Sequence, residues 1–565
     1  LVPHRIFKTR TFLALSLATV FVGVFVISFL GVAEYFFWDE FSVRFNFVAV
    51  DYLAYTHEVL GNIQESYPLG PLFAGLTVLA VLVTWWARTT TWAKQYRNCQ
   101  LAPRRRLATA LVWLATPIIA ALGIANDSGP RFANNYDHEL SRNGLFALVD
   151  AFWSNEIDYE SFYAKMDDAD AWQRMRAILA DDPNVTMGLD TSSIRRRVTE
   201  VGEARRFNVI LLTIESLSSS YLGRFGNPLH LTPEIDSIAR QGMLFTHCYA
   251  TGTRTVRGME ALTLSIPPTP GRSIVKRPHN KGLFNIGQLL VDRGYDAAFI
   301  YGGHGFFDNM NDFFGGNGFR VVDRAAKPDD AETFGTIWGA CDEDLFDWTL
   351  EEADRAHAAA QPFFHFVMTT SNHRPYTFPA GKIEGEQGRR SSAVRYTDYA
   401  IGQFLAKART RAWFKNTLFV IVADHCASSS GRAGLPVDKY EIPLIIYAPE
   451  VLEPRCIDTL CSQIDVAPTL LALMGVNYDS EFYGRDILSM APEEGRALIG
   501  NHQKLGLLTP TRLVTLEPKQ SIHAYDVATD RSLLEVPIDE AMKLDAIAYY
   551  QSAFLRLREH RKNAP

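Results

Sequence analysis

The chain has 565 residues, of which 47% are hydrophobic and 21% are charged, and its formal net charge is −7. A chain of this length exceeds one ordinary domain and can bury a large core. The acidic balance gives no reason to expect a nucleic-acid partner, because proteins that bind nucleic acid usually present a basic surface to its phosphates. Since the sequence opens on Leu1 and not on a methionine, we expect residues upstream of it.

Three runs near the N-terminus contain no charged residue: Thr11–Ala33, Ser66–Ala87 and Leu107–Asn126. Each holds 20 to 23 residues, which is enough for an α-helix to cross the hydrocarbon core of a bilayer. A core helix of a soluble protein can mimic one such run, but three of them favour membrane spans. We therefore predict an integral, multi-pass transmembrane region over residues 1–130, with spans at about 11–37, 66–87 and 107–126.

The basic residues predict which side of the membrane each loop faces. Loops rich in Lys and Arg stay in the cytoplasm, and the loop between the second and third runs carries Arg88, Lys94, Arg97, Arg104, Arg105 and Arg106. We therefore expect everything from about Asp127 onward to lie outside, as the extracytoplasmic or periplasmic part of a protein of the cytoplasmic (inner) membrane. The first run is too long, and its exit Tyr35–Trp38 too aromatic, for a cleaved signal peptide.

Residues 131–205 are expected to form an extracytoplasmic helical linker. Apolar residues such as Leu145, Val149 and Phe152 recur there at the intervals of an amphipathic helix. Such helices can pack on the main domain, which we favour, or lie on the membrane surface. The basic run Arg195–Arg197 either faces lipid phosphates or forms a solvated turn.

From residue 207 the sequence alternates short apolar runs with amphipathic stretches, as in an α/β domain. Strands are predicted at 207–214, 296–301, 363–369, 417–423 and 443–447, and helices at 232–241, 282–293, 343–360, 391–409 and 462–474. After about residue 500, short alternating segments and a last helix near 540–558 indicate a small C-terminal subdomain. We therefore expect one catalytic α/β domain over 206–565.

The cysteines suggest one disulfide. Cys456 and Cys461 flank a short turn in the part of the chain expected outside the cytoplasm, where disulfides persist. We expect these two to pair, although spacing alone does not fix connectivity. Cys99 falls in the predicted cytoplasmic loop.

Two predicted strands end on residues that can bind a metal ion. The apolar run Asn208–Ile214 leads directly to Glu215, and Thr417–Ala423 leads to Asp424 and His425. Buried parallel strands deliver such side chains at their carboxyl ends. A turn rich in Gly and Thr, at 251–258, is expected where a loop becomes a helix, so that a hydroxyl there can meet an anion beside free backbone N–H groups.

Glu215, Thr255, Asp424 and His425 together offer hard oxygen atoms and one imidazole, a set suited to one divalent cation. A threonine hydroxyl is a poor nucleophile at its ordinary pKa, and a bound divalent ion lowers that pKa. The same ion neutralises an oxygen of a phosphoryl or sulfuryl group under attack. The four residues therefore predict metal-assisted chemistry on such a group.

These motifs resemble those of the alkaline phosphatase/sulfatase superfamily. The resemblance rests on Asn208–Ser216, the turn at 251–260, Met368–Tyr376 and Ala423–His425, and it is strongest to the lipoteichoic acid synthases and phosphoglycerol transferases. It runs from about residue 205 to 500. It implies N-terminal transmembrane helices followed by a domain with a central, mostly parallel sheet flanked by helices.

The resemblance also implies a mechanism. Members of this group bind one Mn, Mg or Zn ion through the residues that match Glu215, Thr255, Asp424 and His425. The threonine becomes a covalent phosphoglycerol-enzyme, charged from phosphatidylglycerol. The implied partners are a membrane phospholipid donor and a glycan or lipid acceptor.

Two further assignments follow from the family pattern. Gly252-Thr-Arg-Thr255 satisfies the Gly-x-x-Thr pattern, which selects Thr255 over Thr253. His373 matches the histidine that contacts the substrate phosphate.

The sequence departs from the family at Tyr301–Asp312, where lipoteichoic acid synthases place an Arg and a Trp on the glycerophosphate. This chain offers residues such as His304 and Asn309 there, so the head group is implied less firmly than the reaction. Arg254 and Arg257 can supply the missing positive charge at the substrate; the alternative is that both are exposed turn residues.

Three other functions remain as alternatives. A phosphoethanolamine transferase shares the metal set and the threonine, although such enzymes usually continue Asp-His as Gly-Glu, whereas Cys426 and Ala427 follow here. A hydrolase of phosphodiesters or sulfate esters is the second, but no Cys or Ser lies in the C/S-x-P-x-R context that formylglycine formation requires. The third is a sensor without activity, against which stands the presence of all four ligand positions.

Overall fold

The computed structural model describes residues 9–54, 56–90, 102–123, 132, 134–153, 159–200 and 203–563. The chain divides into two compact units, Leu1–Ser154 and Asn155–Pro565. The linker expected over 131–205 is therefore shared between the two units. Each unit is described by itself.

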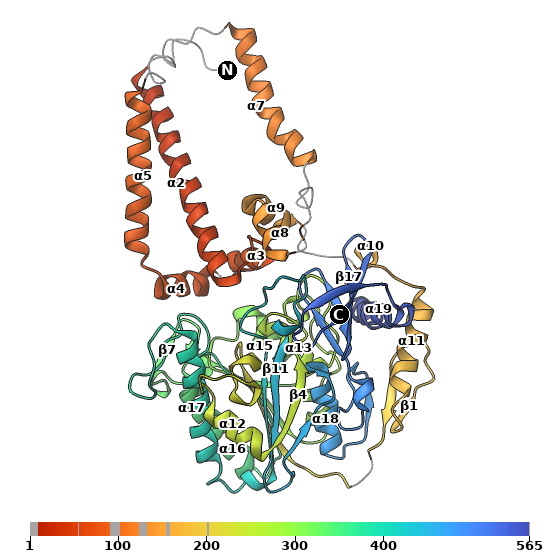
Figure 1. Cartoon of the computed structure of the whole chain (residues 1–565). Coiled ribbons are helices and arrows are strands. Elements are labelled where there is room, and N and C mark those ends of the chain that lie inside the picture. The colour runs from red at the N-terminus through yellow and green to blue at the C-terminus, as the bar shows by residue number, and fades with distance from the viewer. Residues whose placement is uncertain are drawn as a thin grey trace. The chain divides into compact units, whose positions relative to one another are not determined.

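The first unit contains two helices that are long and apolar enough to cross a membrane, α2 (Arg10–Phe41) and α5 (Leu69–Thr89). They lie side by side (Figure 1), and Phe73 of α5 contacts the rings of Phe25 and Phe29 of α2, at 6.4 and 6.1 Å between centroids. Their large outward side chains are exposed, as expected for a surface that faces lipid.

The third predicted span corresponds to α7 (Pro103–Gly123), which has Pro117 in its interior. Its apolar part is limited to Leu107–Ala120, shorter than a bilayer crossing requires. The third span and the orientation of the helices therefore stay predictions. Lys94, Arg97 and Cys99 lie outside the described residues.

Among the described residues of the first unit there are also four shorter helices: α3 (Phe47–Ala54), α4 (Thr56–Ser66), α8 (Asn135–Ser141) and α9 (Gly144–Trp153). α3 and α9 pack near the end of α2 around a small core that includes Phe37, Phe45 and Val48.

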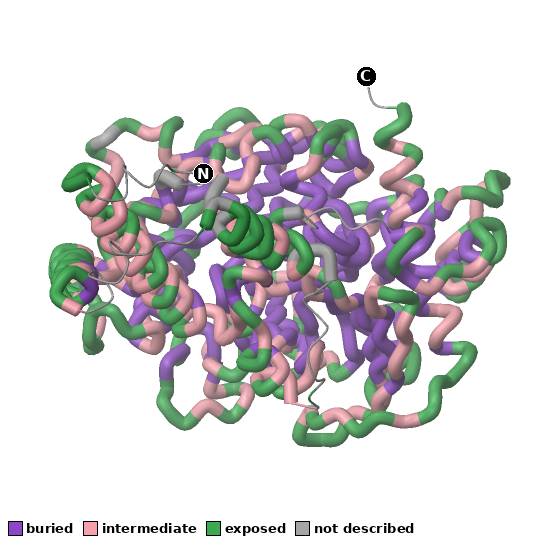
Figure 2. Tube along the Cα trace, turned by 90° about the horizontal axis from the view of Figure 1, so that it is seen from above, coloured by how far each residue is buried: buried purple, intermediate pink, exposed green. Residues whose placement is uncertain are grey.

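A nine-stranded mixed sheet forms the centre of the second unit. Its order is β12 (Arg455–Ile457), β4 (Met243–Tyr249), β11 (Glu441–Tyr447), β10 (Thr417–Ala423), β3 (Asn208–Ile214), β9 (Phe363–Met368), β5 (Asp296–Tyr301) and β6 (Arg320–Val322), with β13 (Cys461–Ser462) paired to β4. Only β11 runs antiparallel to its neighbours β4 and β10. The prediction of a central, mostly parallel sheet is confirmed. The middle strands β3 and β10 are buried along their whole length, and Figure 2 shows that buried residues gather in the interior.

Helices cover both faces of this sheet (Figure 1). One group consists of α12 (Pro233–Gln241), α16 (Asp342–Ala358) and α17 (Arg390–Ala408), and the other of α13 (Thr255–Leu264), α14 (Ile286–Val291) and α18 (Val466–Leu473). The short α15 (Met310–Gly315) contacts β6. α14 begins four residues later than predicted. The Asn285 side chain accepts a hydrogen bond from the backbone N–H of Gln288 and so caps the helix.

The segment before the central sheet was expected to be helical, but it also contains strands. It contains α10 (Tyr159–Phe162), α11 (Asp168–Ala180), β1 (Val185–Met187) and β2 (Arg196–Val198), and β2 pairs with both β1 and β14 (Tyr478–Ser480). Both expectations for the basic run at 195–197 are wrong for Arg196. Its guanidinium is buried and donates to the carbonyl oxygens of Phe482 and Gly484 at 2.7 and 3.2 Å.

The C-terminal part, where a small subdomain was predicted from about residue 500, contains an antiparallel five-stranded sheet within the second unit. Its strands are β15 (Ala497–Gly500), β16 (Leu505–Leu508), β17 (Arg512–Glu517), β18 (Ser521–Val527) and β19 (Leu533–Val536), and the last helix is α19 (Glu540–Asn563). α19 packs against α11. A small hairpin, β7 (Gly335–Thr336) and β8 (Gly339–Ala340), precedes α16.

The predicted disulfide between Cys456 and Cys461 is wrong, because both thiols are free. Cys456 is exposed on β12, whereas Cys461 is buried on β13. Cys461 instead lies opposite Cys248 of β4, since β13 and β4 pair in register at these two residues.

Candidate active site and metal centre

Strand pairing brings two carboxylates together. β3 and β10 are adjacent and parallel, and Ile214 lies opposite Ala423 at their carboxyl ends. Glu215 follows directly after β3 and Asp424 directly after β10, so the two side chains emerge side by side. Both residues are buried.

Thr255 reaches the same edge from β4, which runs in the same direction as β10 because the antiparallel β11 lies between them. After β4 ends, the chain turns and starts α13 at Thr255. α13 passes very close to β10: a Cβ atom on Gly258 would lie 2.4 Å from the carbonyl oxygen of Asp424. Glycine at this position therefore allows the helix to place Thr255 beside the carboxylates.

The four predicted ligands form one cluster. Thr255 Oγ1 lies 3.2 Å from Glu215 Oε2, and His425 Nε2 lies 3.4 Å from Asp424 Oδ2 and 3.8 Å from Glu215 Oε1. The ligand atoms of Glu215, Asp424 and His425 all lie within 4.8 Å of one another. Asp424 Oδ2 is buried without a hydrogen-bond partner among the described residues. Two buried carboxylates with a free oxygen between them and an imidazole fit a divalent cation.

The two buried carboxylates repel each other, and a bound cation would relieve that repulsion. Burial, followed by the charge of Glu215, raises the pKa of Asp424 well above its ordinary value. Burial lowers the pKa of His425 and so favours the neutral imidazole that binds metals. His425 Nδ1 lies 2.7 Å from the carbonyl oxygen of Cys426; donation of the Nδ1 proton to that oxygen leaves the Nε2 lone pair facing the carboxylates.

The backbone around the cluster is held by side chains that sequence reasoning had not singled out. Ser216, at φ 52°, donates its N–H to Asp424 Oδ1 at 2.8 Å and its hydroxyl to Glu215 Oε1 at 2.7 Å. Asn372 donates to the Glu215 carbonyl at 2.9 Å. Gln463 donates to the Asp424 carbonyl at 2.7 Å. Ser216 and Asn372 lie inside the motifs Asn208–Ser216 and Met368–Tyr376, so the sequence could have pointed to them. Nothing in the sequence pointed to Gln463.

Positive charge surrounds the cluster. The charges of Arg254, which precedes Thr255, and of Arg390 act on His425. Arg390 begins α17, and its guanidinium donates to the Tyr376 hydroxyl at 2.8 Å and to the Ala427 carbonyl. Arg390 was missed because its helix follows β9 by more than twenty residues in the sequence.

The loop after β9 carries His373, whose charge acts on Glu215. The imidazole packs against the indole of Trp338 with 4.0 Å between ring centroids, and its Nδ1 lies 3.1 Å from the Arg374 carbonyl. His373 therefore lies close enough to Glu215 to act on its charge, and its contact with a substrate phosphate stays a prediction.

The remaining predicted substrate residues divide into two groups. His304 and Asn309 lie in the loop after β5, which is the strand next to β9; Asn309 donates to the Val275 carbonyl at 3.0 Å. Arg257 points elsewhere: it is buried and donates to Glu260 at 2.6 Å and to the Gly271 carbonyl. The structure thus gives Arg257 a packing role in α13 instead of the expected contact with substrate.

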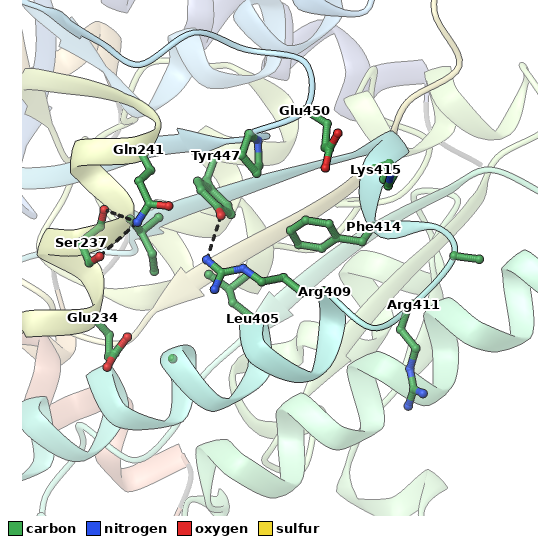
Figure 3. Close-up of a pocket in the computed structure, with 14 residues that line it drawn as sticks. Glu234, Ser237, Gln241, Leu405, Arg409, Arg411, Phe414, Lys415, Tyr447 and Glu450 are labelled. Atoms are coloured by element: carbon green, nitrogen blue, oxygen red, sulfur yellow. Dashed lines mark hydrogen bonds between the residues drawn. The ribbon is translucent and has the colours of Figure 1, made fainter.

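A surface cavity of about 510 Å³ lies away from this site (Figure 3). Its lining includes Arg409, Lys415 and Tyr447. Tyr447 closes the antiparallel β11, whereas β10 begins at Thr417, so the cavity lies at the edge where the parallel strands start. It is therefore at the opposite end of the sheet from Glu215 and Asp424.

Known proteins share this fold. Residues 207–476 match the family described as Sulfatase. A solved structure of a protein in the alkaline phosphatase superfamily from Vibrio parahaemolyticus is 36% identical, with a TM-score of 0.67, and the match covers 72% of this chain and 99% of that chain. The structure of the lipoteichoic acid synthase LtaP from Listeria monocytogenes has a TM-score of 0.55 at 19% identity, covering 64% and 94%; this likeness shows the fold alone.

Two curated relatives extend the comparison. Lipoteichoic acid synthase-like YvgJ from Bacillus subtilis is 25% identical over 327 residues, which cover 52% of this chain and 51% of that protein. Phosphoglycerol transferase I from Xanthomonas axonopodis pv. citri is 25% identical over 312 residues, covering 52% and 44%. The chain thus spans about half the length of the curated relatives it matches.

Three observations point to the same superfamily. They are the mixed sheet, the cluster suited to a metal ion at its carboxyl edge, and the similarity across nearly the full length of a solved relative. The chain is an enzyme of the alkaline phosphatase superfamily, and its residues 207–476 match the family described as Sulfatase.

Proposed function

We propose that this enzyme is a phosphoglycerol transferase that takes the head group of phosphatidylglycerol onto Thr255 and passes it to an extracytoplasmic glycan or lipid acceptor. One observation carries the proposal: the Thr255 hydroxyl, at the N-terminus of α13, lies 3.2 Å from Glu215 within a cluster suited to a cation. The names of the two curated relatives support this class of reaction.

Glu215, Thr255, Asp424 and His425 would hold one divalent ion, and their oxygen atoms with one imidazole suit Mn²⁺, Mg²⁺ or Zn²⁺. When bound, such an ion lowers the pKa of a hydroxyl and neutralises charge on a phosphate oxygen. The protein's own part is to hold the carboxylates in place, which the hydrogen bonds from Ser216 accomplish.

In the proposed first step, Thr255 Oγ1 forms a bond to the donor phosphorus, and the bond between phosphorus and the diacylglycerol oxygen breaks. Thr255 loses one proton and diacylglycerol gains one, so the glycerophosphate remains on Thr255 as a phosphodiester. Arg254, Arg390 and His373 surround the phosphate with positive charge. His304 and Asn309 lie on the neighbouring loop, where we place the glycerol.

In the second step, an acceptor hydroxyl attacks the same phosphorus. The bond to Thr255 Oγ1 breaks, Thr255 regains a proton as the acceptor hydroxyl loses one, and the phosphoglycerol leaves on the acceptor. Water in place of the acceptor would make the enzyme a hydrolase, which is one of the alternatives.

A lipid donor requires an enzyme at the membrane. The apolar helices α2 and α5 suggest a membrane protein, and we propose that α2, α5 and α7 span the cytoplasmic membrane with the catalytic unit outside.

A periplasmic reporter fused after Asp127 should then be active, because the basic loop before α7 stays inside. Activity of a cytoplasmic reporter at the same point would contradict the orientation.

Replacement of Asp424 with Asn should remove metal-dependent stabilisation. Asn retains the acceptor oxygen for Ser216 and His425 but replaces the unpartnered Oδ2 with a neutral amide. Mn²⁺ should raise the unfolding temperature of the wild type by several degrees, because an ion that binds only the folded state stabilises it. Asp424→Asn should show no such rise, whereas in chelator it should unfold at or above the wild-type temperature, since one of two facing carboxylates is gone.

The control for this measurement is Asp398→Asn, which replaces a buried carboxylate that caps α12. This variant should keep the Mn²⁺-dependent rise. A full rise in Asp424→Asn would show that the ion binds elsewhere.

Thr255→Ala should abolish both diacylglycerol release from labelled phosphatidylglycerol and the covalent adduct. Intact-mass analysis should find one glycerophosphate on the wild type, and peptide mapping should place it on Thr255. Thr253→Ala, two residues earlier in the same turn, serves as the matched control and should still form the adduct.

An adduct that persists in Thr255→Ala would refute the assigned nucleophile. Labelled phosphatidylethanolamine, incubated in parallel, separates the two transferase classes: a phosphoethanolamine adduct in place of glycerophosphate would replace the proposed donor and leave the role of Thr255 intact.

A further inference from the structure

The hairpin β7–β8 carries a tryptophan that links two loops of the proposed site. The indole of Trp338 packs against the imidazole of His373 in a tilted arrangement, with ring centroids 4.0 Å apart and planes inclined by 37°. On another side it meets Phe307 edge-on at 5.3 Å. Phe307 belongs to the loop after β5, and His373 to the loop after β9. Trp338 is only 7% exposed, so its ring is fixed by packing.

The same hairpin is tied firmly to the loop that carries His373. The Thr370 hydroxyl donates to the Ala340 carbonyl at 2.7 Å, and the N–H groups of Thr370 and Ser371 both donate to Asp342 Oδ1 at 3.1 Å. Asp342 is fully buried and also accepts from the Thr397 hydroxyl at 2.7 Å. These bonds fix the backbone on each side of the pair formed by Trp338 and His373.

The hairpin is also close to the loop after β5. Ala340 donates its N–H to the Gly302 carbonyl at 2.9 Å. Gly339, at φ 152°, has no room for a side chain: a Cβ atom there would lie 2.4 Å from the Gly302 carbonyl oxygen. The distance between the loops after β5 and β9 is therefore set through the segment around Trp338.

We propose that Trp338 is a positioning residue, which holds the imidazole of His373 in the orientation that binds the donor phosphate. This inference rests on the proposed function and assigns no contact between Trp338 and substrate. Its physical basis is that the Arg374 carbonyl fixes one ring nitrogen while the indole face restricts rotation of the ring. An aromatic face also attracts an imidazolium that forms beside an anionic phosphate.

The indole N–H indicates that the ring face, and not a hydrogen bond, is what Trp338 contributes. Trp338 Nε1 is buried and has no hydrogen-bond partner among the described residues. A buried donor without a partner normally costs stability. A role for the aromatic ring would explain why a tryptophan stands at this position despite that cost. Phenylalanine should therefore replace Trp338 with little loss, whereas leucine, which has no aromatic face, should not.

A double-mutant cycle with His373 tests the proposal on the full chain in detergent, with phosphatidylglycerol as donor and covalent adduct formation as readout. Trp338→Phe should keep kcat/KM within about 3-fold of the wild type, and Trp338→Leu should lower it by about 10- to 100-fold, the usual effect of a misplaced binding group. In the His373→Ala background, Trp338→Leu should add less than about 3-fold, because its effect runs through the missing imidazole.

A loss from Trp338→Leu that is equally large with and without His373 would overturn the proposal, as would a loss in Trp338→Phe equal to that in Trp338→Leu. Trp413→Leu is the matched control: it removes a buried indole far along the sheet, bonded to Asp354, and should lower the unfolding temperature without changing kcat/KM. If Trp338→Leu does not fold, Trp338→Met takes its place in the cycle.

The proposed function and this inference can fail separately. If the wild type forms no adduct with phosphatidylglycerol, the proposed donor is wrong, and the same cycle is run on hydrolysis of bis(4-nitrophenyl) phosphate, a general phosphodiester. Coupling between Trp338 and His373 on that substrate would support the positioning role, and additive effects would refute it.

Discussion

The structure depends on the burial of two carboxylates at adjacent strand ends. Glu215 and Asp424 follow strands that pair in register, so neither can move away from the other without breaking the sheet. Burial of unpaired ions costs several kcal/mol each in proteins. Within the described part of the chain, the histidine, hydroxyl and N–H groups around them offset only part of that cost, since Asp424 Oδ2 remains without a partner. A divalent cation at this position would offset the rest; without one, the raised pKa of Asp424 favours its protonated, neutral form.

The rest of the second unit serves to bring other groups to this pair. The single antiparallel strand β11 separates β4 from β10 yet leaves their carboxyl ends on the same edge, which is how α13 comes to start beside Asp424. On the other side, β9 and β5 follow β3 in order and deliver His373 and the loop with His304. The proposed chemistry is therefore laid out along the sheet in this order: the proposed nucleophile, the proposed cation-binding pair, the proposed phosphate-binding histidine and the proposed head-group loop.

Sequence reasoning located the parts of the site that lie directly after long apolar strands. β5 and β10 have the bounds predicted for them, and β3 begins one residue later, because each is a short and mostly apolar run of the kind typical of a buried strand. β4 was missed, although it leads to the proposed nucleophile, because its sequence interrupts the apolar run with Thr246 and His247. The direction of a side chain could not be predicted from the sequence. Arg257 was expected in the site and instead pairs with Glu260.

Contacts between segments distant in sequence were also beyond prediction. Arg390 and Trp338 enter the site from a helix and a hairpin whose position depends on the whole fold. The disulfide prediction failed for the same reason, because neighbours in sequence such as Cys456 and Cys461 fall on strands that each pair with a different part of β4.

Anomalous diffraction from crystals of the protein grown with Mn²⁺ tests the central claim most directly. The account predicts one peak among Glu215, Thr255, Asp424 and His425, with ligand atoms at roughly 2 Å, a normal distance for oxygen and nitrogen on a divalent ion. A protein that is active with Mn²⁺ but shows no peak at these residues, or a peak from which Thr255 is remote, would contradict it.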